Sequence, residues 1–200
     1  MQCEYYSAGL CQSCSNITTP YSVQVEQKQR SLQNLLQPFA LTELLSPVVS
    51  HEQGFRNKAK MAVYGTSEQP ILGIINQQKQ AVDLIKCPLY PAEFKTAFEH
   101  IREFIRIAQL QPYDINARRG ELKFVLLTFN PADCTWLLRF ILRSKNHLDK
   151  IRKLLPWLQA RWPELQVCSV NLQPEHKAIL EGETEIILTT ETMLSQQLNH

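Results

Sequence analysis

Glycine is scarce in this chain, and its spacing restricts the possible folds more than any other feature. The 200 residues contain 6 glycines, and only Gly65 and Gly73 lie within ten residues of each other. Phosphate-binding loops and dinucleotide folds need clustered glycines, because their backbone N–H groups must approach the ligand closely. No such cluster is present, so we do not expect a nucleotide-binding α/β fold within these residues.

The composition is that of a folded chain. At 44% hydrophobic and 20% charged residues, it can bury the core of one or two domains. The first residues show neither the basic nor the apolar region of a signal peptide. No apolar run approaches the roughly 20 residues that a membrane-spanning helix needs. We therefore expect a cytoplasmic protein with no membrane partner.

Hydrophobic periodicity predicts an α+β fold with a mostly antiparallel sheet and two to three amphipathic helices. Helices are expected at 21–36, after Pro91 and from Leu148, and strands at 55–64, 71–75, 82–85, 122–128, 136–142, 167–172 and 185–188. The strands 122–128 and 136–142 are apolar on both faces, so they should form a hairpin at the centre of a covered sheet. Pro156 should kink or split the last helix.

Positive charge is concentrated in the middle of the chain. The net charge is only +2, yet residues 51–155 hold 17 Lys and Arg against 10 Asp and Glu. Such a region is expected where a surface binds a polyanion, although surplus lysines on a solvated face would give the same count. In strand 55–64, the two-residue period places Arg56, Lys58 and Lys60 on one face, opposite the apolar residues.

The cysteines fall into two groups. Cys3, Cys11 and Cys14 lie in residues 1–20, which have too few apolar residues to fold by burial alone, and Cys87 precedes a proline. Disulfides need an oxidising compartment, zinc usually draws on two close ligand pairs, and an iron–sulfur cluster accepts three close thiolates and a remote one. Spacing leaves cluster, zinc and unligated thiols open, and either metal would order the N-terminal segment. The other two cysteines are expected to be buried: Cys134 and Cys168.

Four motifs follow one another along the chain. They are Met-Gln-Cys with Cys11-x2-Cys14, Gln53-Gly54-Phe55-Arg56-Asn57-Lys58, Cys87-Pro88-Leu89-Tyr90-Pro91, and Arg119-Gly120-Glu121-Leu122-Lys123. Together they resemble the N-terminal half of the bacterial 23S rRNA (uracil-5-)-methyltransferases of the RlmC type. The resemblance extends over essentially all 200 residues.

This resemblance implies a [4Fe–4S] cluster bound by Cys3, Cys11, Cys14 and Cys87. It also implies a cytoplasmic enzyme that methylates C5 of one uridine in 23S rRNA with S-adenosylmethionine, with no obligate protein partner. Residues 1–20 would be a cluster-binding segment, and residues 21–200 a central α+β domain beside the RNA. The basic residues expected to contact RNA phosphates are Arg56, Lys58 and Lys60, and secondarily Arg118, Arg119, Lys123, Arg139 and Arg143.

The catalytic machinery of that family belongs to a downstream Rossmann-type domain, which these 200 residues do not include. No catalytic and no S-adenosylmethionine-binding residue is therefore predicted here, and we expect the chain to be inactive alone. Methylation requires no electron transfer, so we expect a structural cluster. One alternative is a zinc-clipped RNA-binding module with no link to catalysis. Another is a ferredoxin-like electron carrier, which the basic middle and the large apolar helices do not favour.

Overall fold

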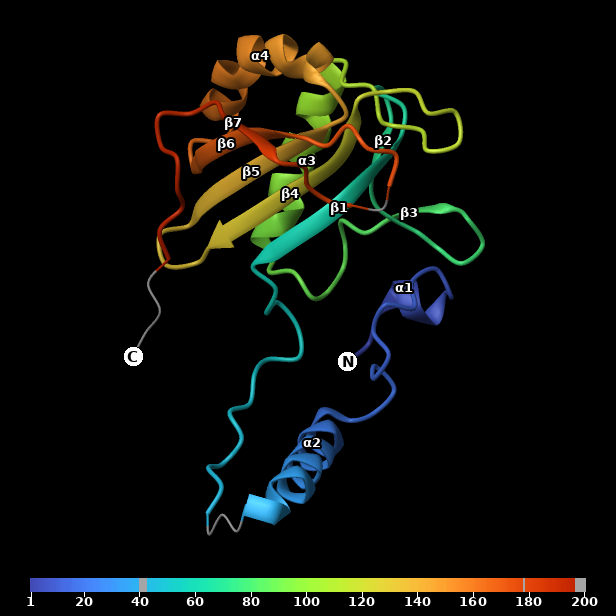
Figure 1. Cartoon of the computed structure of the whole chain (residues 1–200), viewed down its shortest axis with the longest axis vertical. Coiled ribbons are helices and arrows are strands. Elements are labelled where there is room, and N and C mark those ends of the chain that lie inside the picture. Colours follow the sequence, from blue (N-terminus) through green and yellow to red (C-terminus); the bar gives the residue numbers. More distant parts are fainter. Residues whose placement is uncertain (40–42, 178, 197–200) are drawn as a thin grey trace.

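The computed structural model describes residues 1–39, 43–177 and 179–196 (Figure 1). It has the predicted α+β fold, with one seven-stranded sheet in the order β3-β2-β1-β4-β5-β6-β7. The strands are β1 (Lys58–Gly65), β2 (Pro70–Ile75), β3 (Ala81–Asp83), β4 (Leu122–Asn130), β5 (Thr135–Leu142), β6 (Leu165–Leu172) and β7 (Thr184–Ile187). The helices are α1 (Glu4–Ser7), α2 (Tyr21–Leu36), α3 (Glu93–Ile107) and α4 (Leu148–Arg161), with short 3-10 turns η1 (Gln37–Phe39) and η2 (Lys145–His147).

The sheet is antiparallel except at one pair. β5 and β6 run parallel, because α4 carries the chain back across the sheet between them. The predicted hairpin of β4 and β5 is confirmed, with Asn130 opposite Thr135 at its turn, and β4 is the central strand.

One of the two cysteines expected to be buried, Cys134, lies in the β4–β5 turn and is exposed instead. The reason is its position in the turn, where φ is 54°, rather than in the strand.

Helices α3 and α4 cover the same face of the sheet. They lie side by side, with Arg161 of α4 bonded to Glu103 of α3 at 3.2 Å and His100 stacked on Trp162. The apolar stripe expected after Pro91 is buried as predicted; it consists of Phe94, Phe98, Ile101, Ile105 and Ala108. An aromatic cluster fills the end of this core beside the β4–β5 turn, where Phe129 stacks on Trp136 at 4.3 Å.

The opposite face of the sheet has no helix over it among the described residues. Residues 179–196 extend along β5 and β6 there, and Arg139 of β5 forms ion pairs with Glu181 and Glu185 among them. Over β1 the same face is open, and Lys58 and Lys60 are exposed on it. The sheet therefore presents an uncovered region beside its centre.

β1 begins later than the sequence predicts, at Lys58 instead of Phe55. The backbone before it pairs with a different partner, since the Gly54 N–H donates to Pro88 O at 3.0 Å and the Arg56 N–H to Leu89 O at 2.9 Å. Arg56 therefore lies beside the Cys87 loop and does not continue the Lys58 and Lys60 face.

Pro156 does not split the last helix, which runs unbroken from Leu148 to Arg161. A proline at this position removes the hydrogen bond to the carbonyl of Arg152, one turn earlier. Both Pro156 and Arg152 are exposed, so water can satisfy the carbonyl that the proline leaves free.

The N-terminal residues form an arm beside the sheet (Figure 1). Helix α2 has no buried residue, and the chain returns from it to β1 through residues 43–57. Two contacts connect residues 43–57 to the N-terminal arm. Tyr21 Oη accepts a hydrogen bond from Ser50 N at 3.0 Å, and the Met1 ammonium forms an ion pair with Glu52 at 3.1 Å. None of the helices in the described ranges is both long and apolar enough to cross a bilayer.

Candidate functional site

Two stretches of chain, the N-terminal segment and the loop after β3, meet where the cysteines lie. Cys3 stands immediately before α1, whose Tyr5 accepts a hydrogen bond from Lys86 N at 3.2 Å. Cys11 and Cys87 both pack against the edge of the core. The structure thus brings the N-terminal segment to the loop after β3.

The four thiols influence one another. Burial raises the pKa of Cys14, and nearby Cys11 and Cys3 raise it further. Burial also raises the pKa of Cys87, whereas a backbone hydrogen bond from Leu89 opposes that rise. Burial and the neighbouring thiols thus favour the neutral form of Cys14 and of Cys87.

The thiols do not form a ready metal site. Within the described residues, no three His, Cys, Asp or Glu side chains converge closely enough to hold a metal ion. All four cysteines are half-buried free thiols. The cluster expected on Cys3, Cys11, Cys14 and Cys87 therefore stays a prediction, although sulfur donors of this kind suit both iron–sulfur clusters and zinc.

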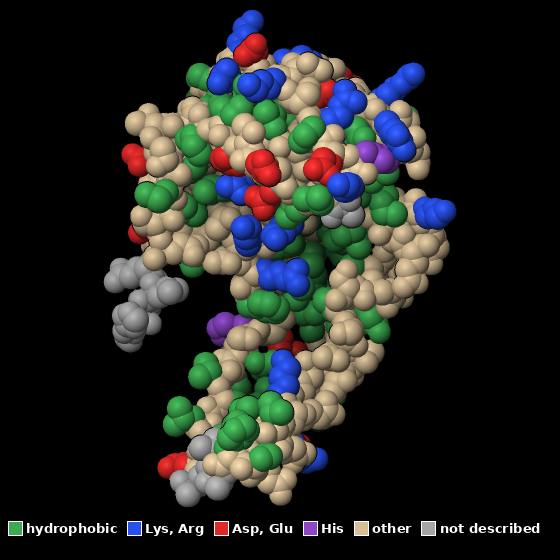
Figure 2. All heavy atoms as spheres, viewed as in Figure 1, with side chains coloured by type: hydrophobic (Ala, Val, Ile, Leu, Met, Phe, Trp, Pro, Cys, Tyr) green, Lys and Arg blue, Asp and Glu red, His purple; other side chains and the backbone are tan. Residues whose placement is uncertain are grey.

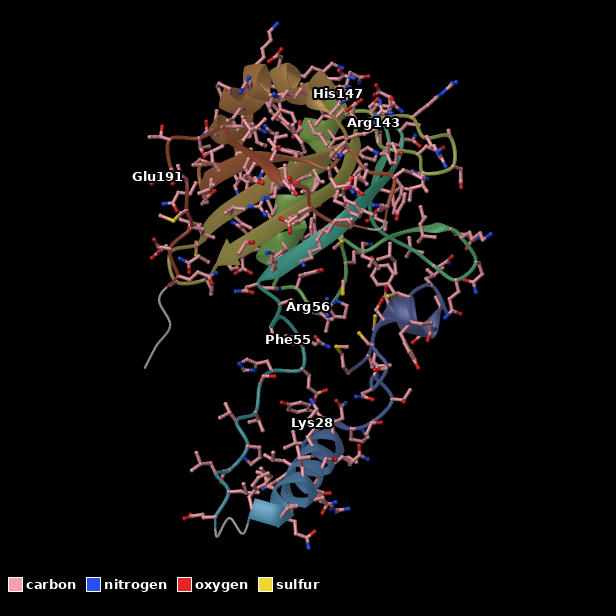
Figure 3. The ribbon with its side chains drawn as sticks, viewed as in Figure 1. Lys28, Phe55, Arg56, Arg143, His147 and Glu191 are labelled. Carbon is pink, nitrogen blue, oxygen red and sulfur yellow. The ribbon has the colours of Figure 1, made fainter. Side chains whose placement is uncertain are left out.

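Arg56 is the cation whose charge acts on Cys14 and Cys87. Figure 3 shows it on the segment between the sheet and the N-terminal arm, next to Phe55. Its charge lowers the pKa of Cys14 and of Cys87, opposing the larger effect of burial. Burial raises the pKa of Tyr90, and the charge of Arg56 acts in the opposite direction. Arg56 would therefore stabilise thiolates here.

Lys58 and Lys60 lie on the open face of β1, where the sequence places them. Their neighbours Ala59, Met61 and Val63 are buried on the helix side, which confirms the predicted alternation. Figure 2 shows Lys and Arg side chains gathered on the viewed face near the start of β1. These exposed ammonium groups are free to contact phosphates.

The secondary RNA candidates fall into two kinds. Arg118 and Arg119 are exposed in the 113–120 loop. Lys123 is only 6% exposed, and its ammonium donates to Gln173 Oε1 and to Glu175 O. The last two candidates pair with carboxylates inside the chain: Arg139 with Glu181 and Glu185, and Arg143 with Glu121. Arg118 and Arg119 thus have the better access to a ligand.

The motif that ends in Lys123 has a structural explanation in this chain. Gly120 has φ of +93°, and a Cβ there would lie 2.0 Å from Pro112 O, so only glycine fits. Glu121 is 5% exposed and accepts hydrogen bonds from Arg143, Ser144 and Asn146. This network fixes the 113–120 loop to the end of β5.

Two residues of the open face were not predicted from the sequence. Tyr64 and Tyr113 line two adjoining hollows beside the 113–120 loop. The alternation that places Lys58 and Lys60 on the outer face of β1 also places Tyr64 there, so the sequence could have predicted Tyr64. Tyr113 lies in an irregular stretch between α3 and β4, where no period indicates its direction.

The chain is similar along its whole length to curated enzymes named 23S rRNA (uracil(747)-C(5))-methyltransferase RlmC. It is 50% identical over 199 residues to the one from Xenorhabdus nematophila, and 49% identical over 199 residues to those from Escherichia coli. Each alignment covers 100% of this chain and 53% of the relative, so the chain spans about half the length of the curated relatives it matches. The resemblance predicted from the four motifs is confirmed. No protein-family model matches the chain.

A solved structure shares the fold. It is the Pyrococcus abyssi tRNA (uracil-54, C5)-methyltransferase in complex with S-adenosyl-L-homocysteine, with a TM-score of 0.61 and 17% identity. The similarity covers 93% of this chain and 46% of that one. At this identity the likeness supports the architecture of the described sheet and helices.

Proposed function

From its whole-length match to RlmC-type 23S rRNA (uracil-5-)-methyltransferases, we propose that this chain is the RNA-holding part of such an enzyme. The observation that carries the proposal is the open face of β1, where Lys58 and Lys60 are exposed. Cationic side chains of this kind bind RNA phosphates and position the RNA without reading its bases. An rRNA substrate would place the protein in the cytoplasm.

The methyl transfer itself would depend on residues outside this chain. S-adenosylmethionine would bind there, and the chain by itself would be inactive. The proposed contribution of residues 1–200 is to hold the RNA so that the target uridine is presented to the methyl donor. We propose 23S rRNA as the partner because the curated relatives are named for it.

A [4Fe–4S] cluster on Cys3, Cys11, Cys14 and Cys87 is part of the proposal. It is supported by the meeting of the N-terminal segment with the Cys87 loop and by the neighbouring Arg56. When bound, the cluster would supply four metal–thiolate bonds that hold the arm against the sheet. Arg56 would stabilise the thiolates of Cys14 and Cys87 through its charge.

Metal analysis of anaerobically purified protein tests the cluster. We expect about four iron and four sulfide per chain, and their loss in Cys87→Ser. Cys134→Ser is the matched control, since that thiol is exposed and belongs to the β4–β5 turn. A colourless protein that holds zinc without iron or sulfide would instead support the zinc-clipped module.

A salt series tests the RNA contact. The probe is an RNA hairpin that carries the loop around uridine 747 of 23S rRNA, the position in the names of the relatives. Replacing Lys58 and Lys60 by alanine should reduce the slope of log affinity against log salt by about 1.4–1.8, at 0.7–0.9 per phosphate contact. Arg152→Ala with Lys153→Ala, on the exposed side of α4, should leave the slope unchanged. Equal slopes for all three proteins would refute the contact.

A further inference from the structure

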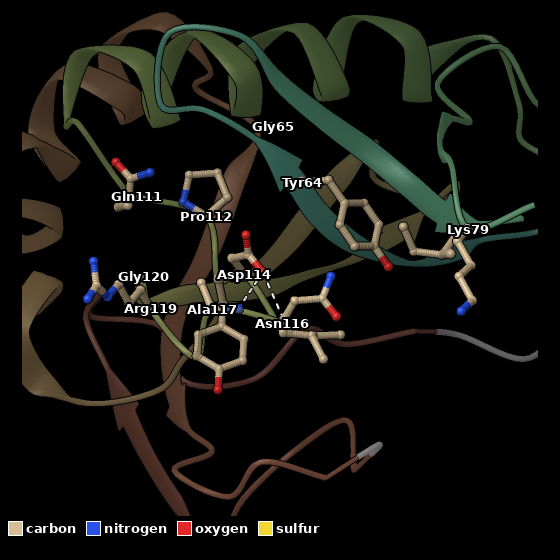
Figure 4. A pocket seen from close by; sticks show the side chains of 13 residues that line it. Tyr64, Gly65, Lys79, Gln111, Pro112, Asp114, Asn116, Ala117, Arg119 and Gly120 are labelled. Carbon is tan, nitrogen blue, oxygen red and sulfur yellow. Dashed lines mark hydrogen bonds between the residues drawn. The ribbon is translucent and has the colours of Figure 1, made fainter.

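Two adjoining hollows lie beside the 113–120 loop, with volumes of about 570 and 260 Å³. Tyr64, Tyr113 and Ile115 line both of them. Figure 4 shows the larger hollow, with Tyr64 on β1 and Asp114 and Asn116 of the loop around it. The larger volume falls within the range of roughly 300–1,000 Å³ that is usual for small-molecule sites.

A small residue, Ala62, lies between aromatic ones in the lining of the smaller hollow. Ala62 is directly opposite Phe124 in the register of β1 and β4, and it shares its face with Tyr64 two residues later. Tyr64 is half-buried, so one part of its ring is packed and another part is accessible. Ile115 is 56% exposed at the same place. The lining therefore combines accessible apolar side chains with polar ones such as Asn116.

The second tyrosine is held rigidly. Tyr113 Oη bonds to His176 Nδ1 at 2.9 Å, and the Lys123 ammonium lies 4.8 Å from the centre of the Tyr113 ring. Lys123 is in turn fixed by Gln173 and Glu175. The wall that faces Tyr64 is therefore pre-organised, which reduces the entropy lost when a flat group enters.

Positive charge surrounds the hollows. Lys79 and Arg119 line the larger one, and among the described residues neither forms an ion pair. The carboxylates nearby are already engaged. Asp114 accepts hydrogen bonds from Asn116 N and Ala117 N, and Glu175 forms an ion pair with Lys177 at 2.6 Å.

We propose that Tyr64 is a stacking platform for one unpaired base of the RNA, with Lys79 and Arg119 contacting the neighbouring phosphates. Single-stranded RNA is commonly recognised by bases that stack on aromatic side chains while cations follow the backbone. The inference rests on the proposed RNA binding and adds a base subsite to it. Lys58 and Lys60, six and four residues away along β1, would hold phosphates on the same face.

Fluorescence anisotropy with the uridine-747 hairpin tests the subsite. Tyr64→Leu keeps an apolar side chain but removes the flat ring, and should weaken binding about 5–150-fold, which corresponds to 1–3 kcal/mol for one stacked base. Tyr64→Phe keeps the ring and should bind within about twofold of wild type, on the same principle. Trp157→Ala removes a partly buried aromatic ring from α4, on the helix side, and should leave RNA binding unchanged.

Two further measurements separate this proposal from the function on which it rests. The salt slope of Tyr64→Leu should equal that of wild type, since no phosphate contact is removed. Replacing loop nucleotides one at a time by abasic ones should reveal one position that weakens wild type and Tyr64→Phe but not Tyr64→Leu. If Tyr64→Leu binds like wild type, the subsite is wrong and the RNA proposal stands. If wild type shows no salt-dependent binding of the hairpin, both proposals fail.

Discussion

Replacing Glu121 with glutamine should destabilise the chain by about 3 kcal/mol. One carboxylate oxygen accepts from Arg143 and Asn146 at 3.1 Å, and the other accepts from Ser144 N at 3.0 Å and Ser144 Oγ at 2.7 Å. A glutamine NH2 in place of either oxygen would face an N–H donor. Hydrogen bonds to a charged group contribute about 1.5–3 kcal/mol each, and those that are lost here are not additive.

The destabilisation caused by Glu121→Gln should depend on pH. Burial disfavours the charged form of Glu121, but hydrogen bonds from Ser144 and Arg143 outweigh it and lower the pKa below its usual value. The stabilisation by Glu121 is therefore present above the pKa of an unfolded glutamate, about 4.3. It is lost as the pH falls through the lower pKa of the folded state. The wild type and Glu121→Gln should thus differ most near neutral pH and converge in acid.

Thermal unfolding followed by circular dichroism at pH 7 and at low pH measures this difference. A change of about 3 kcal/mol corresponds to a fall in Tm of about 6–12 °C for a chain of this size. Glu99→Gln removes the same charge from an exposed position on α3 and is the control. A fall in Tm at pH 7 no larger than that of the control would refute the role assigned to the network.

Three other outcomes are expected. Gly120→Ala should cost about 2–4 kcal/mol by urea unfolding, because its Cβ meets Pro112 O, whereas Gly9→Ala has open space and should cost about 1 kcal/mol for its positive φ. Phe94→Ala should cost about 3–5 kcal/mol by the same measurement, since it removes a fully buried ring that touches Trp136. Cys168 should not react with Ellman's reagent at pH 8 unless the chain is unfolded, because burial raises its pKa to about 12, whereas Cys134 should react at once. Reaction of Cys168 in the folded chain would show that the core opens.

The helices and the central hairpin could be predicted because their signals are local. The stripe that begins at Phe94 repeats at three and four residues, and the β4–β5 turn stands between two apolar runs. The parallel pairing of β5 and β6 had no such signal, since it depends on where α4 packs.

Candidate site residues were predicted where alternation decides exposure, and missed where distant contacts decide it. Lys58 and Lys60 follow from the period of β1. The burial of Lys123 does not follow from sequence, because an irregularity in pairing between Leu122 and Phe124 interrupts the period. Arg56 is not part of β1 because its backbone N–H donates to the carbonyl of Leu89, more than 30 residues later in the sequence.

The separation in sequence between the N-terminal cysteines and their partner loop has a consequence during synthesis. Cys14 leaves the ribosome before Cys87 is made, and at 5–20 residues per second the interval is roughly 4–15 s. Residues 1–20 contribute no fully buried side chain, so nothing covers those thiols until the β3 loop follows. During that interval, oxidation or a passing metal ion can capture them, so the arm is secured only after the β3 loop has been made.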